Sequence, residues 1–501
     1  MMEQYVATKE KYKDCILFYR LGDFYEMFFD DAILASKELE ITLTGKDCGM
    51  EERAPMCGIP FHAADTYINQ LVKKGYKVAI GEQVEDPKLA KGLVKREVIR
   101  IVTPGTNLSS ESLEESKNNY LMCISYIGKN YGISVTDLST GVFKTCQIQQ
   151  AEKVVDEINK FQPSEVLYQA GVDQVEEIHA VCERLQVSHT EAPDYYFNSE
   201  TDEETLKRQF HINSIEGLGL KDSPACVASC GALMQYLHET QMSSLSHINH
   251  IETYSVDSFM ILDSATRRNL ELTETLRDKQ KRGSLLWVLD KTKTAMGARK
   301  LREFVEQPLL YKDAIEKRLD AIEAINKELI VREELREYLN TIYDLERLLT
   351  RIALKTANPR DLLAFKTSIQ YLPDIYNLLR ELPCERINEI YEDYDSLEDL
   401  YDLLEQAIVE EPPVSIKEGG IFKQGYRDEI DELRLAKTEC KTWLADLEAK
   451  EREKTGIKGL KIKYNKVFDY YFEVTNSFKS LVPDYFIRKQ TLVNAERFTT
   501  D

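Results

Sequence analysis

The sequence has no apolar segment long enough to cross a membrane. Windows such as Ala225 to Met234 are among its most apolar, and they are far shorter than the ~18 residues that a membrane-spanning helix needs. The chain also does not open with a basic stretch followed by an apolar one, so no signal peptide is predicted. A soluble, cytoplasmic protein with no membrane partner is therefore expected.

Two further patterns are missing. The ten cysteines are scattered, and the closest pair, Cys226 and Cys230, has the i,i+4 spacing of a helix face with no histidine pair beside it. Reduced thiols are therefore expected rather than disulfides or a zinc site. The phosphate-loop signature G-x-x-x-x-G-K-[ST] is also absent, because neither Gly45-Lys46 nor Gly128-Lys129 is followed by Ser or Thr. We expect no metal, no cofactor and no catalytic residue in these 501 residues.

Basic residues are outnumbered by acidic ones, with 65 Lys and Arg against 86 Asp and Glu and a formal net charge of -21. Such a balance argues against a protein that coats DNA indiscriminately, because non-specific affinity comes from neutralised phosphates. From Lys454 to Arg497, however, nine Lys and Arg stand against four Asp and Glu. An acidic protein can still bind DNA at one basic module. The acidic stretch from Glu381 to Glu432 is expected to be a solvated helix face.

The length predicts several domains, because single hydrophobic cores stop growing near ~250–300 residues. The first hundred residues show a mixed α/β pattern. It includes a helix that Asp30 or Asp31 would cap and a second helix that ends near Gly75. From Tyr120 to Asn249 the pattern is strand, strand, strand, helix, strand, helix.

The rest of the chain is first helical and then extended. Residues 251–453 are rich in Leu and Glu and predict several long helices. Their breaks are expected at the prolines, which are Pro308, Pro359, Pro373, Pro383 and Pro412-Pro413. From Thr455 the pattern returns to strands. Because side chains alternate along a strand, Lys461 and Lys463 lie on one face of the first strand and make it basic. An edge strand that is protected by lysines would show the same pattern.

The segment Gly22-Asp23-Phe24-Tyr25-Glu26-Met27-Phe28 is the most informative stretch of the chain. If it is a strand, Phe24 and Glu26 point to the same side. An apolar wedge beside a hydrogen-bonding carboxylate suits the probing of a base stack, since apolar side chains can enter a base step and kink the duplex. The segment alone is more typical of a core Phe next to a solvated Glu, because aromatic residues on strands are usually buried.

Longer runs of sequence resemble the MutS family of DNA mismatch repair proteins. The run from Phe18 to Phe28 resembles that family's mismatch-recognition motif. Other motifs follow in the family's order and span nearly the whole chain. They are Pro55-Met56-Cys57-Gly58-Ile59-Pro60-Phe61-His62-Ala63, Arg100 to Thr106, Asp263 to Glu271, Thr294-Ala295-Met296-Gly297 and Arg488 to Phe498.

The resemblance implies a multidomain fold that combines α/β domains with an α-helical one. Four parts are implied: a mixed α/β mismatch-recognition domain, a ribonuclease-H-like connector domain, a long helical core and lever domain, and a small β-rich clamp domain that this chain would contain in truncated form. Their expected ranges are 1–113, 116–249, 250–444 and 445–501. The start of the chain is also expected to be clipped relative to the family.

The same resemblance implies the site residues. The residue that matches Phe24 stacks on a mispaired base in that family, and the one that matches Glu26 hydrogen-bonds to it. Contacts to the DNA backbone are expected from basic residues near Phe24 and in the clamp, together with one polar residue of the family motif. These candidates are Lys46, Arg96, Arg100, Lys461, Lys463, Arg488, Lys489, Asn494 and Arg497.

Partners and cofactors are implied in the same way. The family binds mismatched double-stranded DNA, works with a MutL-type repair partner and forms a homodimer in the full-length protein. Its DNA-dependent ATPase domain, with ATP and Mg²⁺, follows the clamp and is expected to lie outside these 501 residues. A cytoplasmic, nucleoid-associated protein of bacterial type is expected.

Three alternatives remain open from the sequence. The first is a ribonuclease-H-like nuclease, for which Asp137 follows a strand but no partner carboxylates can be assembled around it. The second is a MutS-like protein in recombination or mobile-element control, although such branches typically lack the Phe-x-Glu pair. The third is a helical scaffold built on residues 251–453, which leaves the motifs at the start unexplained.

Overall fold

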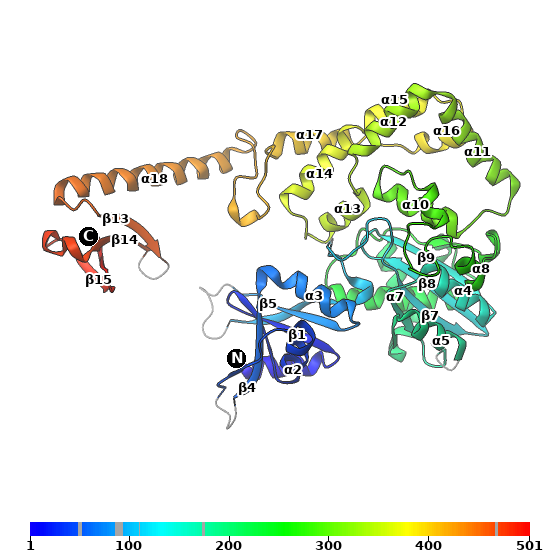
Figure 1. The fold of residues 1–501 in the computed structure, drawn as a ribbon, viewed down its shortest axis with the longest axis horizontal. Helices are drawn as coiled ribbons and strands as arrows, with labels where there is room; N and C mark the ends of the chain where they lie inside the picture. Colours follow the sequence, from blue (N-terminus) through cyan, green and yellow to red (C-terminus); the bar gives the residue numbers. More distant parts are fainter. Residues whose placement is uncertain (49–52, 86–93, 110, 173–175, 466–468, 501) are drawn as a thin grey trace. The chain divides into compact units, whose positions relative to one another are not determined.

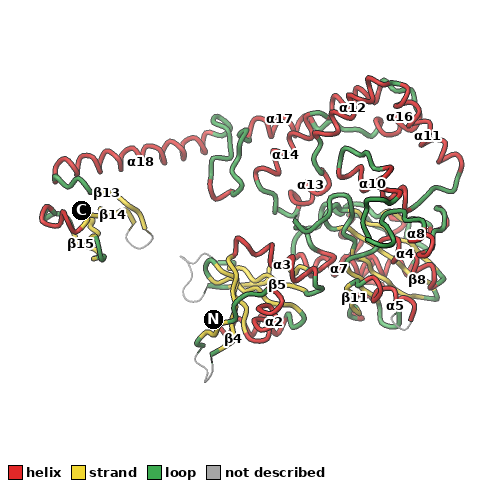
Figure 2. Tube along the Cα trace, viewed as in Figure 1, coloured by secondary structure: helices red, strands yellow, loops and turns green. Residues whose placement is uncertain are grey.

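The structure is a computed structural model that describes residues 1–48, 53–85, 94–109, 111–172, 176–465 and 469–500. The chain divides into two compact units, residues 1–401 and 402–501. In the first unit, strands are found up to residue 253 and helices dominate after it (Figure 2). None of the helices in the described ranges is long and apolar enough to span a lipid bilayer.

The chain begins with a six-stranded sheet in the order β3-β4-β2-β1-β5-β6, in which only the β1–β5 pair is parallel (Figure 1). Its strands are β1 (Cys15–Leu21), β2 (Phe24–Phe28), β3 (Thr44–Lys46), β4 (Ala54–Pro60), β5 (Lys77–Gln83) and β6 (Arg96–Val102). The accompanying helices are α1 (Met2–Lys11), α2 (Phe29–Leu39), α3 (Ala64–Lys73) and the 3-10 turns Phe61–Ala63 and Pro104–Thr106. Helices α2 and α3 cover one face, and Tyr5 of α1 packs on the other.

The start of α2 differs from the sequence prediction. The helix begins at Phe29, and Asp30 and Asp31 lie inside its first turn instead of capping it. Asp31 is buried, where its carboxylate accepts hydrogen bonds from the Leu17 amide at 3.0 Å and from Lys9 Nζ at 2.8 Å. The side chain therefore satisfies partners on other elements, which short-range cap patterns do not register.

A second sheet follows, in the order β11-β10-β7-β8-β9-β12. Its strands are β7 (Leu121–Ile127), β8 (Asn130–Asp137), β9 (Val142–Ile148), β10 (Glu165–Tyr168), β11 (Ser188–Glu191) and β12 (Glu252–Thr253). The helices are α4 (Ala151–Phe161), α5 (Glu176–Leu185), α6 (Ser199–Phe210), α7 (Pro224–Gln241) and the 3-10 turns Asp194–Phe197, Ile215–Leu218 and Val256–Ser258. The order from β7 to α5 confirms the predicted succession of strands and helices.

Separate apolar clusters fill the two faces of this sheet, one under α6 and α7 and one under α4 and α5. Helix α7 lies very close to β8, because a Cβ added to Gly132 would stand 2.1 Å from the Ala225 carbonyl oxygen. Ser125 also donates to that oxygen at 2.7 Å. Only glycine fits at position 132.

The Thr103-Pro104-Gly105 motif joins the two sheets. Glu165 is fully buried and accepts hydrogen bonds from the Gly105 amide at 3.0 Å, from the Tyr236 hydroxyl at 2.6 Å and from the Thr103 hydroxyl. A Cβ on Gly105 would meet Leu121 at 2.8 Å. The motif is therefore a packed connection that holds a buried carboxylate through three donors.

Helices make up most of residues 264–407. They are α8 (Ser264–Asn269), α9 (Leu285–Leu289), α10 (Ala295–Glu306), α11 (Lys312–Lys327), α12 (Leu329–Thr341), α13 (Leu345–Ala353), α14 (Pro359–Gln370), α15 (Leu372–Arg380), α16 (Glu385–Glu392) and α17 (Glu398–Ala407). They are shorter than predicted, and capping residues as well as prolines mark where they begin. Asp263 accepts from the Thr266 amide at 2.6 Å, and Thr294 accepts from the Gly297 amide at 3.0 Å.

The second unit contains α18 and a small antiparallel sheet in the order β13-β14-β16-β15. The elements are the 3-10 turns Ile416–Glu418 and Asn476–Leu481, α18 (Asp428–Thr455), β13 (Lys461–Asn465), β14 (Asp469–Thr475), β15 (Ile487–Thr491) and β16 (Ala495–Thr499). Phe472, Val474 and Phe498 form a core on one face of this sheet with Leu460 and Phe486.

We expect the buried Asp202 of α6 to make the stability of the layer formed by α6 and α7 depend on pH. Its buried carboxylate faces Gly231 and has no hydrogen-bond partner among the described residues, and burial raises its pKa to about 8. A raised pKa means that the unfolded chain ionises first, so stability is lost as pH rises from about 4 to about 8. We expect Asp202→Asn to raise the melting temperature at pH 8 and to leave it nearly unchanged at pH 4.

The matched control for this prediction is Glu204→Gln, which removes an exposed carboxylate from the same helix. Differential scanning fluorimetry between pH 4 and pH 8 gives the comparison. The prediction is wrong if the melting temperatures of Asp202→Asn and Glu204→Gln differ from that of the native protein by the same amount at every pH.

Candidate nucleic-acid interface

Phe24 lies at the exposed end of β2. Its side chain is 47% exposed, so Phe24 is not the core residue that the segment alone would suggest, and its ring is accessible as a stacking role requires. Residues 24, 26 and 28 share one face of the strand, and Tyr25 and Met27 enter the core on the other. On the first face, Tyr5 covers Phe28 at a ring distance of 4.9 Å, and the core cluster there does not include Phe24. The strand thus carries an anchored aromatic at one end and an open one at the other.

Glu26 lies between these two rings and is paired. Lys46 Nζ is 2.6 Å from Glu26 Oε2, with side chains that are 34% and 17% exposed, respectively. The same Nζ lies 5.3 Å from the ring centroid of Phe28. Lys46 comes from β3, which is separated from β2 by β4. The positive charge of Lys46 and the negative charge of Glu26 offset each other beside Phe24. The other carboxylate oxygen of Glu26, Oε1, takes no part in the 2.6 Å contact.

An arginine and a second exposed aromatic lie near the start of β2. The guanidinium carbon of Arg20 is 3.8 Å from the ring centroid of Phe61, and Arg20 Nε donates to the Gly22 carbonyl at 2.6 Å. The Phe61 amide donates to the Asp23 carbonyl at 3.0 Å. The sequence reasoning did not single out Arg20 or Phe61, although both lie inside the motifs that carry the family resemblance.

The two other basic candidates of this domain have partners within it. Arg96 donates from Nε to the Arg20 carbonyl at 2.7 Å and from Nη1 to the Val94 carbonyl at 2.9 Å. Burial lowers the pKa of Arg100, whose charge is nevertheless favoured by Asp65. A role of either residue in phosphate binding stays a prediction.

In the second unit, the sheet separates the basic candidates into two groups. The register places Lys461, Lys463 and Arg497 with Glu473 on the face opposite the core. Lys463 Nζ lies 2.6 Å and Arg497 Nε 3.9 Å from the Glu473 carboxylate. Lys461 is exposed and has no ion-pair partner among the described residues. This face therefore carries three cations around one carboxylate.

The remaining candidates lie on β15 and on the turn that follows it. Arg488 is 3.6 Å from Glu496, a buried carboxylate that Lys479 also contacts at 2.6 Å. Lys489 is exposed at the bulge between Arg488 and Gln490. Asn494 is exposed in the turn before β16, where its carbonyl accepts from the Asn476 amide at 3.1 Å. All three residues are thus exposed, and Arg488 is also ion-paired with Glu496.

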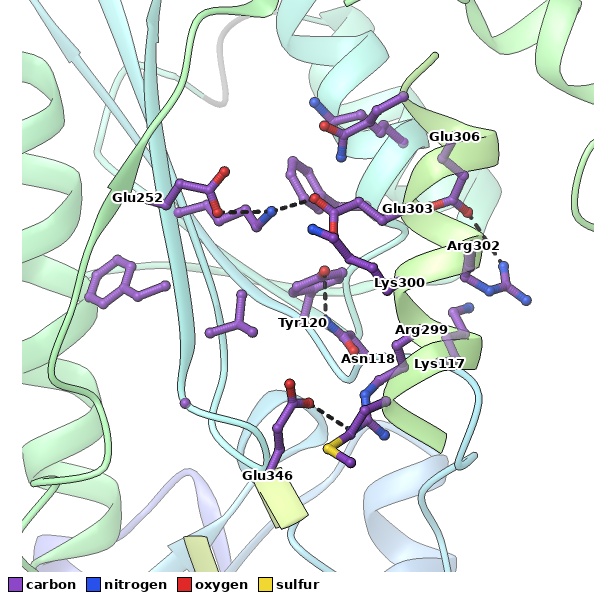
Figure 3. A pocket seen from close by; sticks show the side chains of 18 of the residues that line it. Lys117, Asn118, Tyr120, Glu252, Arg299, Lys300, Arg302, Glu303, Glu306 and Glu346 are labelled. Carbon is purple, nitrogen blue, oxygen red and sulfur yellow. Dashed lines mark hydrogen bonds and ion pairs between the residues drawn. The ribbon is translucent and has the colours of Figure 1, made fainter. Parts of the chain in front are cut away.

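A charged pocket of about 280 Å³ lies between the second sheet and α10 (Figure 3). Lys144 of β9 bonds Glu303 at 2.8 Å and Glu252 at 3.1 Å, and Arg299 bonds Glu346 at 2.7 Å. Burial raises the pKa of the nearby Glu306. Since these carboxylates face cations, the pocket is an ion-paired junction, and no group of three metal-binding side chains was found in the described ranges.

The comparisons with known proteins agree on one family. Residues 1–111, 119–249 and 265–481 match family models described as MutS domain I, MutS domain II and MutS domain III. The chain is 60% identical over 505 residues to the DNA mismatch repair protein MutS of Lachnoclostridium phytofermentans, covering 100% of this chain and 54% of that protein. It is 53% identical to the protein of the same name from Acetivibrio thermocellus, covering 100% and 58%. The chain therefore spans little more than half the length of these relatives.

If Lys461 and Lys463 contact phosphates as predicted, we expect their contributions to duplex binding to be unequal. We expect Lys461→Ala to flatten the plot of log affinity against log salt concentration by about one unit, since one phosphate contact is lost. Lys463→Ala is expected to flatten it less, because the charge of Lys463 is already partly neutralised by Glu473 at 2.6 Å. Fluorescence anisotropy with duplexes of different sequence measures both slopes.

Glu473→Gln is the matched control and is expected to tighten binding to every duplex. An effect of Lys461→Ala that depends on DNA sequence would contradict the assignment, because phosphate contacts do not read bases.

Proposed function

Because this chain belongs to the MutS family, we propose that it recognises mispaired or unpaired bases in duplex DNA as part of DNA mismatch repair. Phe24 enters the base stack as an apolar wedge, and Glu26 accepts a hydrogen bond from the displaced base. The observation that carries the proposal is the exposed ring of Phe24 two residues from Glu26 on one strand face. Unstacking costs a few kcal/mol per step and least at a mispair, so a wedge gains selectivity there.

We propose that the other parts take the roles expected of the family. Residues 116–249 form a ribonuclease-H-like connector, which is supported by three antiparallel strands followed by two parallel ones in the order β9-β8-β7-β10-β11. Residues 250–444 form the core and lever helices, and residues 445–501 belong to a clamp that grips the DNA backbone. The basic face around Glu473 supports that role.

The longer protein is proposed to couple recognition to ATP and Mg²⁺ as a DNA-dependent ATPase. We assign this activity to the part of the relatives that the chain does not cover, because the phosphate-loop signature is absent from the 501 residues. A homodimer and a MutL-type partner belong to the same proposal, as does a place in the bacterial cytoplasm at the nucleoid.

A nuclease function is less well supported. The carboxylate of Asp137 accepts hydrogen bonds from the Ser139 amide at 2.8 Å, from the Ser139 hydroxyl at 2.7 Å and from the Asn119 amide at 3.1 Å. These bonds give Asp137 a structural task at the end of β8. A role in recombination is disfavoured by the Phe24–Glu26 pair.

The proposal predicts that Phe24→Ala abolishes the preference for mispaired DNA. Loss of one base–aromatic stack costs ~1–3 kcal/mol, which corresponds to a roughly 5- to 150-fold weaker affinity for the mispaired duplex. Binding to paired duplex and the melting temperature are expected to change little, because the ring is not part of the core. Competition between a mispaired duplex and a fully paired duplex of otherwise identical sequence measures the preference.

Ile33→Ala is the control for Phe24→Ala, since Ile33 is an exposed apolar residue on α2 of the same domain. The proposal fails if Phe24→Ala keeps the preference, or if it unfolds the domain while Ile33→Ala does not.

The Glu26–Lys46 pair predicts a coupled effect. Glu26→Ala is expected to preserve or raise binding to paired DNA, because a carboxylate is removed and Lys46 becomes free for a phosphate. Discrimination is expected to fall, because the base loses its acceptor. In a Lys46→Met background the part of the gain that comes from the freed Lys46 should vanish, while the part that comes from removing a carboxylate should remain, and a double-mutant cycle measures this coupling. An equal loss on paired and mispaired DNA after Glu26→Ala would rule out the assigned role.

A further inference from the structure

Two histidine rings meet at one edge of the second sheet. His179 lies on α5 and His189 on β11, the edge strand that follows α5 (Figure 2). Their Nε2 atoms are 3.2 Å apart, and the rings are nearly perpendicular at a centroid distance of 4.8 Å. A short connection with Gln186 at a φ of 56° turns the chain from the helix into the strand. The fold thus directs two imidazole nitrogens at one point.

The second nitrogen of each ring faces an acceptor. His189 Nδ1 lies 3.1 Å from the Val187 carbonyl oxygen, and because a carbonyl only accepts, this nitrogen carries the proton. The lone pair of His189 is then on Nε2, which faces His179. His179 Nδ1 lies 3.5 Å from Glu183 Oε1. Histidines that bind metal ions are oriented in the same way, with the other ring nitrogen held by a carbonyl or a carboxylate.

The separation of the two Nε2 atoms matches a shared metal ion. Two nitrogens at ~2.0–2.1 Å from one ion, with an angle between 90° and 110°, lie roughly 2.8–3.4 Å apart. We propose that His179 and His189 form a two-histidine site for a borderline divalent cation of the Cu²⁺, Ni²⁺ or Zn²⁺ class. The His179 side chain is 41% exposed, so water has access and completes the coordination.

The site uses none of the residues proposed to bind DNA. Within the described residues no third histidine, cysteine or carboxylate joins the pair, so the affinity rests on two imidazoles. For such ligands Cu²⁺ is expected to bind more tightly than Ni²⁺ or Zn²⁺. Without metal, His179 Nε2 donates to His189 Nε2, and when the ion binds that proton moves to His179 Nδ1, which faces Glu183.

Isothermal titration of the protein, purified without a histidine tag, with CuSO₄ and separately with ZnCl₂ tests the proposal. One saturable site is expected, and His179→Gln and His189→Gln should each weaken it by about tenfold or more. His211→Asn is the control, because His211 is exposed and its φ of 53° is tolerated by Asn. Binding that is unchanged in both glutamine variants, or no saturable binding at all, would overturn the proposal.

A second measurement uses the native sequence and does not depend on the stability of a variant. The chain has seven histidines, so selective labelling gives seven ring signals in an NMR spectrum. Substoichiometric Cu²⁺ is expected to broaden the signals of His179 and His189 first. Earlier broadening of any other pair would place the ion elsewhere and contradict the assignment.

Discussion

The position of Phe24 depends on how the far end of the same strand is anchored. Phe28 packs under Tyr5, its amide donates to the Tyr5 hydroxyl at 3.2 Å, and that hydroxyl in turn donates to the buried Asp31 at 3.2 Å. Because residues 24, 26 and 28 share one face, fixing Phe28 fixes the direction of the other two. An aromatic ring can then be exposed without being loosely held, which a wedge requires if it is to unstack a base.

Both proposed DNA-binding surfaces combine cations with a carboxylate. Lys46 bonds Glu26 in the first unit, and Lys463 and Arg497 face Glu473 in the second. Partly exposed ion pairs contribute little to stability, so their main effect is on the local charge. Lowered local charge weakens indiscriminate attraction to phosphates, as does the net charge of -21. Such surfaces leave more of the binding to the contacts with the mispair.

The local features of the fold could be predicted from sequence, and the contacts between distant segments could not. The two-residue period placed Phe24 and Glu26 on one face, and prolines such as Pro359 marked helix starts. The Glu26–Lys46 pair reaches across β4 and depends on a strand order that a single sequence does not show. Asp31 was misassigned as a cap candidate for the same reason, since its partners lie on α1 and β1.

The fluorescence of 2-aminopurine placed next to an unpaired base tests the central claim most directly, because unstacking raises its emission. If Phe24 enters the base stack, saturating protein should raise the emission of the duplex with the unpaired base and leave a fully paired duplex of the same sequence nearly unchanged. Equal emission from the two duplexes at saturation would contradict the account.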